Sequence, residues 1–402
     1  MMAAMSRLRQ IIFALIALVA VLAASEAAVR LGGNHPSRQY ALLIHSHAGD
    51  VPLLTPVGEG VLRINPFAEP WFNRVRPSRE KPRPDITRIV ALGGSTVRGA
   101  GLDAAHAFPA LVETKLASRA VCVETINLGG NGLTSYQLRW VEKSAIELRP
   151  DLVLIYAGHN DWTGSRLYGE LARRPKSTRL RALLARSRSY LFLRAAVMKL
   201  RGISDGALRA PPGGRASREE LLRVARRFET NIGRITKLLQ QAGSRVVLCT
   251  AISDVLTGPT GTPFATAAQD QSPAARRQLL MDAAQRATWS EPPTMAVDMY
   301  AKGLRAWSEG EFAAAYPWLD TARDKDDMPL RAGKPFRDAM RRAAQGADGF
   351  VDLEAAYRAR FVAGEDVLGL FLDNVHFSAA GGEWVAAQIA AALIAQNSVA
   401  AK

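Results

Sequence analysis

Short apolar runs alternate with segments of helical periodicity along most of the chain after residue 85. The apolar runs have the length of strands and cover residues 87–94, 121–130, 150–158, 244–253 and 349–357. The segments in which apolar residues recur at helical spacing cover residues 108–118, 135–148, 218–243 and 381–396. Strands that alternate with helices predict an α/β fold, with a doubly wound parallel sheet of five strands and helices on both faces.

Two segments do not follow this alternation, and we expect both to be insertions in a main domain of residues 85–396. Residues 166–215 are rich in basic side chains, and residues 255–345 are mainly helical. Within the second insertion, the spacing of small and apolar residues over 300–322 resembles one tetratricopeptide hairpin. Stacked repeats need about three units to bury a core. A single copy, with Pro317 expected to interrupt its second helix, therefore predicts a cap on the main domain.

Residues 1–33 have the pattern of a membrane-targeting segment. Two arginines precede an apolar run over residues 11–24, and the apolar pattern resumes after Glu26 and continues to residue 31. A helix over the whole stretch would be long enough to span a bilayer, which needs roughly 20 residues, whereas a cleaved signal peptide would end near the small residues 23–25. We favour an uncleaved signal-anchor helix because the apolar pattern resumes. The basic flank then stays in the cytoplasm, which predicts a single-pass protein of the inner membrane with its main domain outside the cytoplasm.

Residues 34–84 connect this segment to the main domain and are irregular and rich in proline, which predicts a tether or lead-in segment. With 402 residues, of which 48% are hydrophobic, the chain can bury one large core or two modest ones. Its two cysteines, Cys122 and Cys249, lie inside apolar runs, so we expect buried thiols and neither a disulfide framework nor a zinc cluster. No metal or other cofactor is expected.

The positive charge of the chain is concentrated in one region. Residues 166–227 contain 17 Lys and Arg against 4 Asp and Glu, a difference of +13 within a net charge of +15. No nucleic-acid-binding module surrounds this region, so we expect no nucleic-acid partner. A solvated or membrane-facing helical surface is the favoured interpretation, and contact with anionic lipid or an acidic glycan is the partner that it predicts.

Residues capable of chemistry follow the predicted strands at their carboxyl ends. Ser95 follows the first strand, Gly132 the second and Asn160 the third, while Asp373 and His376 lie beyond the fifth strand and before the last helix. Ligands of doubly wound sheets bind at this edge, so we expect these residues to converge there.

The residue types suit acyl transfer. A serine hydroxyl becomes a good nucleophile when a histidine accepts its proton, and an aspartate at the other ring nitrogen holds that histidine in one tautomer. A backbone N–H from a glycine turn and an asparagine amide can stabilise the oxyanion that forms. The competing interpretation, a nucleotide-binding turn after the first strand, lacks the lysine and the glycine spacing of such loops.

The ordered motifs resemble those of the SGNH, or GDSL-type, hydrolase family. Its four blocks correspond here to Gly93-Gly94-Ser95-Thr96, Asn131-Gly132-Leu133-Thr134, Gly158-His159-Asn160-Asp161 and Asp373-Asn374-Val375-His376. The resemblance implies a flavodoxin-like strand order 2-1-3-4-5. It also implies Ser95 as the nucleophile, His376 as the base and Asp373 as its orienting partner, with Ser95, Gly132 and Asn160 forming the oxyanion hole.

One position departs from the family pattern, since Gly94 replaces the aspartate that often precedes the nucleophile. In the implied strand order, two strands separate Cys122 from Cys249, which predicts that both thiols stay reduced because a disulfide requires Cα atoms within roughly 7 Å.

The resemblance implies a serine esterase that acts on a small acyl ester or an acylated glycan, with O-acetyl carbohydrate as one candidate, and the N-terminal segment predicts that this esterase is anchored in the membrane and faces away from the cytoplasm. Two alternatives remain open. An O-acyltransferase of cell-envelope glycans would use the same triad, and a non-catalytic envelope interaction protein would use the helical insertion instead.

Overall fold

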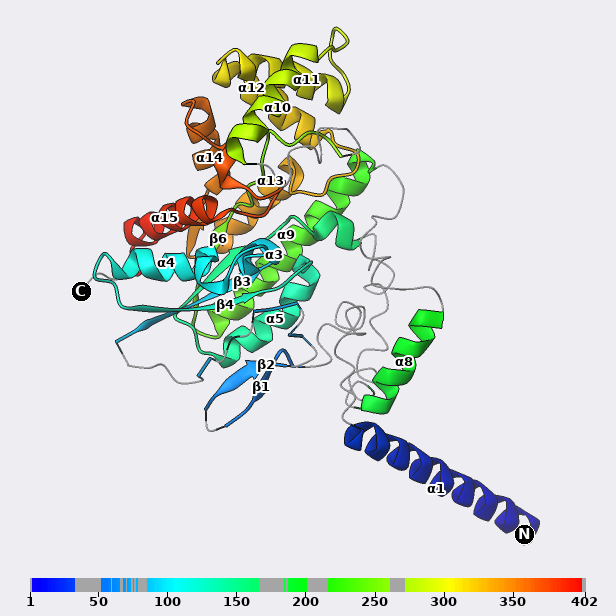
Figure 1. The fold of residues 1–402 in the computed structure, drawn as a ribbon. Helices are drawn as coiled ribbons and strands as arrows, with labels where there is room; N and C mark the ends of the chain where they lie inside the picture. The colour runs from blue at the N-terminus through cyan, green and yellow to red at the C-terminus, as the bar shows by residue number, and fades with distance from the viewer. Residues whose placement is uncertain are drawn as a thin grey trace.

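A five-stranded parallel sheet forms the centre of the protein (Figure 1). The computed structural model describes residues 2–32, most of 52–78, 85–165, residue 184, and residues 187–200, 216–260 and 272–399. The strands are β3 (Thr87–Gly93), β4 (Val123–Gly129), β5 (Leu152–Tyr156), β6 (Arg245–Cys249) and β7 (Gly349–Val351). Their order is β4-β3-β5-β6-β7, so the predicted α/β fold and the order 2-1-3-4-5 are confirmed.

The carboxyl ends of all five strands lie in register. Gly93, the last residue of β3, pairs with the last residues of β4 and β5, and Cys249, the last residue of β6, pairs with those of β5 and β7. Every residue of the central strand β5 is buried, because helices cover both faces of the sheet. The loops that leave this edge therefore start side by side from a rigid base.

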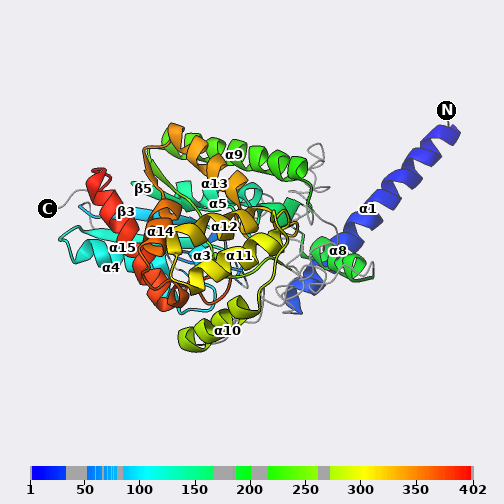
Figure 2. The same cartoon turned by 90° about the horizontal axis from the view of Figure 1, so that it is seen from above.

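Helices cover the sheet on two sides, as Figure 2 shows. One layer contains α4 (Phe108–Ala117) and α15 (Ala379–Ala395), which pack against each other. The other contains α5 (Ser135–Glu147), α9 (Arg218–Gln241) and α13 (Lys334–Ala343). The described part of the domain also contains the short helices α3 (Ser95–Arg98), η2 (Ala104–His106), η5 (Ala344–Gly346) and η6 (Leu368–Leu370).

The segment before the main domain is more ordered than its composition predicted. Strands β1 (Leu54–Pro56) and β2 (Leu62–Ile64) pair as an antiparallel sheet, and three of their apolar side chains belong to the core of the domain. Phe72 is also buried and forms a β-bridge with Gly130 at the end of β4. The described part of the lead-in thus packs onto the domain, since it has apolar side chains to bury.

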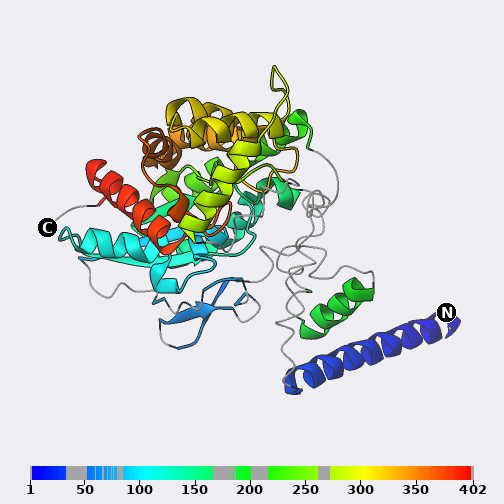
Figure 3. The ribbon, with the colours of Figure 1, turned by 45° about the horizontal axis from the view of Figure 1, so that its top comes forward.

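Apart from α13, which packs against α9, the described helices of the second insertion form a layer on the side of the molecule opposite the small sheet (Figure 3). It contains α10 (Pro273–Arg286), α11 (Ala296–Ser308) and α12 (Phe312–Asp324), and α12 contacts α14 (Leu353–Val362). The expectation that Pro317 interrupts the second helix of the hairpin is wrong, because α12 continues through it. Proline lacks the N–H for one backbone hydrogen bond of α12, but close packing against α11 keeps the helix intact. At this contact a Cβ atom on Gly303 would lie 2.8 Å from Leu319.

Two predictions about the edges of the sheet also need correction. The last apolar run, 349–357, is a strand only to Val351, and helix α14 begins at Leu353 with Asp352 as its N-cap. Cys249 is buried and Cys122 is only half-buried, because Cys122 precedes the edge strand β4; both thiols are free.

The N-terminal helix α1 (Met2–Leu31) projects away from the domain (Figures 1 and 3). Its residues Ile12–Leu31 have a mean hydropathy of 2.5 and none of them is buried, so this helix is long and apolar enough to cross a membrane. An amphipathic helix, α8 (Arg188–Leu200), lies beside the carboxyl end of α1.

Candidate active site

Two glycines place Ser95 at the carboxyl edge of the sheet. Strand β3 ends at Gly93, and Ser95 is the first residue of α3. A Cβ atom on Gly93 would lie 2.1 Å from the backbone oxygen of Tyr156, so only glycine fits there. A Cβ atom on Gly94 would lie 2.8 Å from Asn160 Nδ2. The glycines therefore let the chain turn close to β5 and leave space for an amide beside the serine.

The side chains of Ser95, His376 and Asp373 form one hydrogen-bonded chain. The distance from His376 Nε2 to Ser95 Oγ is 2.7 Å, and the distance from His376 Nδ1 to Asp373 Oδ2 is 2.6 Å. All three residues are half-buried, so the chain is fixed by the protein and still reachable from solvent. This geometry allows the imidazole to accept the serine proton while the carboxylate orients the ring.

The loop of residues 371–378, which we call the histidine loop, is held by its own hydrogen bonds. Asp373 Oδ1 accepts the backbone N–H groups of Val375 and His376, at 2.8 and 2.7 Å. Burial alone would raise the pKa of Asp373, but the hydrogen bonds and charge of His376 and these two N–H groups lower it below its ordinary value. Asp373 is therefore a carboxylate at neutral pH, as its orienting role requires.

Asn160 and Gly132 lie on the loops that flank the serine. Gly132 has a φ of +66°, which favours glycine. Asn160 Nδ2 donates one hydrogen bond to the backbone oxygen of Leu133, at 3.1 Å, and lies close to Gly94. The amide is thus oriented by the glycine loop, and its second N–H group remains for a ligand beside Ser95.

The neighbours of Asn160 are buried and contact the scaffold. Asp161 Oδ1 accepts the backbone N–H of Ser135 at 3.1 Å, and burial raises the pKa of this carboxyl group to about 6. Burial, followed by the charge of nearby His376, lowers the pKa of His159 to about 3, so its imidazole is neutral. Neither side chain belongs to the hydrogen-bonded chain of Ser95.

Two further contacts support the site. Thr96 Oγ1 is 3.4 Å from the backbone oxygen of Val375, which joins α3 to the histidine loop and links two of the motif blocks. Asn73, which belongs to no motif and comes from the lead-in segment, donates through Nδ2 to the backbone oxygen of Arg98 at 2.7 Å. Both contacts became visible only when the fold placed distant segments together. In the described part of the chain, no group of three or more His, Cys, Asp or Glu side chains is arranged to hold a metal ion.

Comparison with known proteins gives one family and several similar folds. The sequence model of the GDSL-like Lipase/Acylhydrolase family matches residues 91–384, which include all five site residues. The acetyl xylan esterase AlAXEase aligns with 76% of this chain and 99% of its own, at 14% identity and a TM-score of 0.39. A mutant of Axe2, an acetyl-xylooligosaccharide esterase from Geobacillus stearmophilus, aligns with 78% of this chain and 96% of its own, at 15% identity and a TM-score of 0.36. A GDSL-like lipase from Bacteroides thetaiotaomicron covers 79% and 92%, at 12% identity and a TM-score of 0.34. No curated protein matches the chain.

Proposed function

This chain belongs to the GDSL-like lipase/acylhydrolase family and is an ester-hydrolysing enzyme, and we propose that it cleaves its ester through an acyl-enzyme on Ser95. The observation that carries the proposal is the 2.7 Å distance between Ser95 Oγ and His376 Nε2. It is a hydrogen-bond distance that needs no rearrangement before proton transfer.

Acylation begins when His376 Nε2 accepts the Ser95 proton as Oγ attacks the ester carbonyl carbon. The carbonyl oxygen becomes an oxyanion, which the N–H groups of Ser95 and Gly132 and the Asn160 amide stabilise. The tetrahedral intermediate then expels the alcohol, which takes the proton from His376 Nε2. The acyl group is left as an ester on Ser95, and His376 is neutral again. Asp373 stays ionised and stabilises the imidazolium between these two transfers.

Deacylation repeats these steps with a second acceptor. Water gives up a proton to His376 Nε2 as its oxygen attacks the acyl carbon. The bond between the acyl carbon and Ser95 Oγ then breaks, Oγ takes the proton back from His376, and the acid is released. A sugar hydroxyl in place of water would make the same site an O-acyltransferase. We favour hydrolysis because it is the activity of the family, and an O-acetyl carbohydrate of the cell envelope is the proposed substrate.

We also propose that α1 is an uncleaved anchor, so that the main domain lies outside the cytoplasm at the inner membrane surface. The position of α8 supports this proposal. Glu26, near the carboxyl end of α1, caps the start of α8, where it accepts the backbone N–H groups of Arg188 and Ser189, each at 3.0 Å. Exposed apolar side chains of α8 are Phe192, Leu193, Val197 and Leu200. With the surrounding excess of basic residues, this helix suits the interface of an anionic bilayer.

A fluorophosphonate probe tests the central proposal. The full-length protein in detergent should be labelled at Ser95, as mapped by mass spectrometry, and Ser95→Ala should not be labelled. An unlabelled parent protein that is folded would favour the non-catalytic interaction protein. The O-acyltransferase alternative predicts a different rate of deacylation. An added acceptor glycan would then discharge the acyl-enzyme faster than water does.

A further inference from the structure

A two-residue segment of the helical insertion, Arg331-Ala332, reaches the catalytic edge of the sheet. Both residues are buried, with exposures of 4% and 1%. We propose that this segment positions the base and the oxyanion asparagine relative to each other, so that the insertion supports catalysis through its contacts with the site loops. The inference rests on the proposed roles of His376 and Asn160 and adds to them.

Arg331 holds the loop that follows β6, residues 250–258, which we call the β6 loop. Its Nη1 donates to the backbone oxygen of Asp254 at 2.7 Å, and its Nη2 donates to that of Thr257 at 2.9 Å. Two donors of one planar guanidinium thus clamp two carbonyl groups of the same loop. A lysine has no such fork and would replace only one of these bonds.

Asp254 connects the β6 loop, which Arg331 holds, to the histidine loop. Its backbone N–H donates to the backbone oxygen of Asn374 at 3.1 Å, and Asn374 follows Asp373 directly. The Asp254 side chain is fully buried and is fixed by an ion pair with Arg276, another residue of the insertion. The β6 loop therefore cannot move away from the histidine loop without breaking buried bonds to the insertion.

Ala332 holds the other side of the site. Its backbone N–H donates to His159 Nδ1 at 3.1 Å, and His159 directly precedes Asn160. A Cβ atom on Gly158, which has a φ of +131°, would lie 3.4 Å from the Ala332 Cβ. The segment thus packs directly against the loop that carries the oxyanion amide.

The tautomer of His159 follows from its partners. Since Nδ1 accepts the Ala332 N–H, the ring proton is on Nε2, which lies 3.2 Å from the Tyr156 hydroxyl. That hydroxyl donates to the backbone oxygen of Ile252 at 3.1 Å and accepts the N–H of Ile252 at 3.0 Å. His159 therefore ties the loop of Asn160 to both the insertion and the β6 loop, with its ring nitrogens and the hydroxyl each satisfied.

The base and the oxyanion donor must keep their spacing for the reaction to proceed. A misplacement of about 1 Å can cost about 100-fold in rate, even from a mutation away from the reacting atoms. The Arg331-Ala332 segment bonds directly to the loop of Asn160, through His159, and to the β6 loop, which in turn bonds to the histidine loop. Replacing Arg331 should lower kcat with little change in KM, because its bonds act on the spacing of the reacting groups through the β6 loop.

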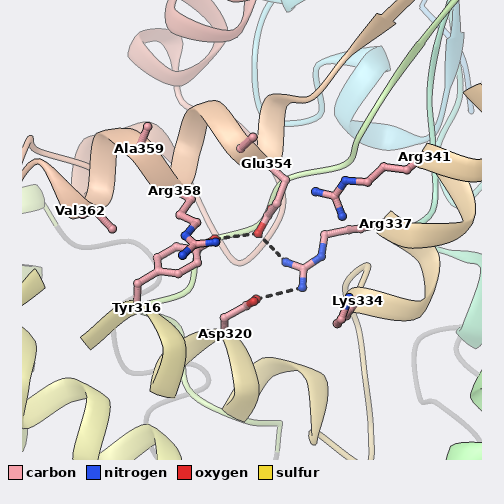
Figure 4. Close-up of a pocket in the computed structure, with 10 residues that line it drawn as sticks. Tyr316, Asp320, Lys334, Arg337, Arg341, Glu354, Arg358, Ala359 and Val362 are labelled. Atoms are coloured by element: carbon pink, nitrogen blue, oxygen red, sulfur yellow. Dashed lines mark hydrogen bonds and ion pairs between the residues drawn. The ribbon is translucent and has the colours of Figure 1, made fainter. Parts of the chain in front are cut away.

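A second buried arginine of the insertion provides a matched control. Arg337 is 3% exposed, and its guanidinium bonds to the carboxylates of Asp320 and Glu354 (Figure 4). These groups line a cavity of about 490 Å³ between α12, α13 and α14, to which no residue of the proposed triad contributes. Arg337 is linked to the β6 loop through Glu354 and Arg323, whose Nη1 donates to Ser253 Oγ at 3.1 Å. The variant Arg337→Met should therefore reduce stability as a buried arginine does but lower kcat less than Arg331→Met, which removes direct bonds to that loop.

The test compares Arg331→Met, Arg331→Lys and Arg337→Met in the full-length protein in detergent, with kcat expressed per folded active site. We expect Arg331→Met to lower kcat by about 10- to 100-fold with KM changed less than about threefold, and Arg331→Lys to recover part of the loss. A kcat for Arg331→Met equal to that of Arg337→Met would overturn the inference.

The contact between Ala332 and His159 can be tested even if Arg331→Met does not fold. His159→Asn keeps an acceptor near the position of Nδ1, whereas His159→Phe keeps the ring and removes the acceptor. We expect the Phe variant to be the slower of the two, and its loss in kcat to be non-additive with that of Asn160→Ala. Additive losses, or equal rates for the two His159 variants, would contradict the inference. If Ser95→Ala is inactive while the Arg331 and His159 variants have normal rates, this inference is wrong and the proposed function stands. An active Ser95→Ala enzyme would instead contradict the proposed function.

Discussion

His376 Nε2 lies 2.7 Å from Ser95 Oγ although 281 positions separate the two residues in the chain. Ser95 leaves the end of β3 near the middle of the sheet, and His376 lies in the loop before the final helix α15. The carboxyl ends of parallel strands, aligned in register, bring these loops to one edge. The relationship leads to the following expectations.

Ser95→Ala and His376→Ala should each abolish ester hydrolysis while the protein stays folded. Both residues are half-buried at the surface of the edge, so truncation leaves the core unchanged. Hydrolysis of a short-chain acyl ester and thermal unfolding of the full-length variants in detergent would measure the two properties. Hydrolysis by Ser95→Ala at the parent rate would show that another residue is the nucleophile.

Asn160→Ala should lower kcat by about 10²- to 10³-fold with a smaller change in KM, because the amide acts mainly on the oxyanion of the transition state. Steady-state kinetics with a soluble ester would measure both constants. A loss confined to KM would mean that Asn160 positions the substrate in its ground state.

Gly94→Ala should fold and be slower than the parent by roughly 10-fold, because its Cβ atom, 2.8 Å from Asn160 Nδ2, displaces the amide. The contrast is Gly93→Ala, whose Cβ atom would lie 2.1 Å from a backbone oxygen and should prevent stable folding. Unfolding temperatures and kcat for both variants distinguish the two effects. An unchanged kcat for Gly94→Ala would show that the amide has room to move without loss of function.

His159 should make the protein less stable as pH falls. Burial lowers the pKa of His159 from 6.5 to about 3 in the folded protein. As pH falls below about 6.5, the unfolded chain binds a proton at this residue that the folded protein does not. His159 therefore reduces the free energy of unfolding by roughly 1 kcal/mol for each pH unit in that range. Asp161 acts in the opposite direction, because burial raises the pKa of its carboxyl group to about 6.

Urea unfolding of the full-length protein at pH 7, 6 and 5 would measure this dependence. The variant His159→Asn, which does not titrate, should show a smaller slope against pH than the parent. Equal slopes would assign the acid sensitivity to other groups.

Helix α8 should be protected from hydrogen exchange by an anionic bilayer. In nanodiscs that contain phosphatidylglycerol, residues 188–200 should exchange more slowly than in zwitterionic nanodiscs, and 1 M salt should reduce the difference because it shortens the Debye length to about 3 Å. The double change Phe192→Ser and Leu193→Ser should remove the protection. Met295→Ser, at an exposed apolar residue of the insertion, is the control and should have no effect. Protection that is independent of lipid charge and of these changes would contradict a lipid contact.

Local patterns were sufficient to predict the sheet and most of the loops that carry the site. The apolar runs that became β3, β5 and β6 are nearly continuous because both faces of the sheet are covered there, and a glycine or a polar residue follows each of them within a few positions. Ser95, Gly132 and Asn160 could be placed at one edge because each follows a recognisable strand, and His376 because it precedes a long apolar segment that is typical of a helix. Strand order came from the family resemblance and not from periodicity.

What the patterns could not supply depends on contacts between distant segments. Pro317 predicts a break in the helix because proline has no backbone N–H to donate, yet packing against α11 preserves the helix. The residues next to Arg331 in the sequence form no motif that indicates its role. Its hydrogen bonds form only when the insertion folds back onto the β6 loop. Hydrophobic periodicity is a property of residues that are close in the sequence. The carbonyl partners of a buried arginine belong to distant segments, so only the tertiary structure determines them.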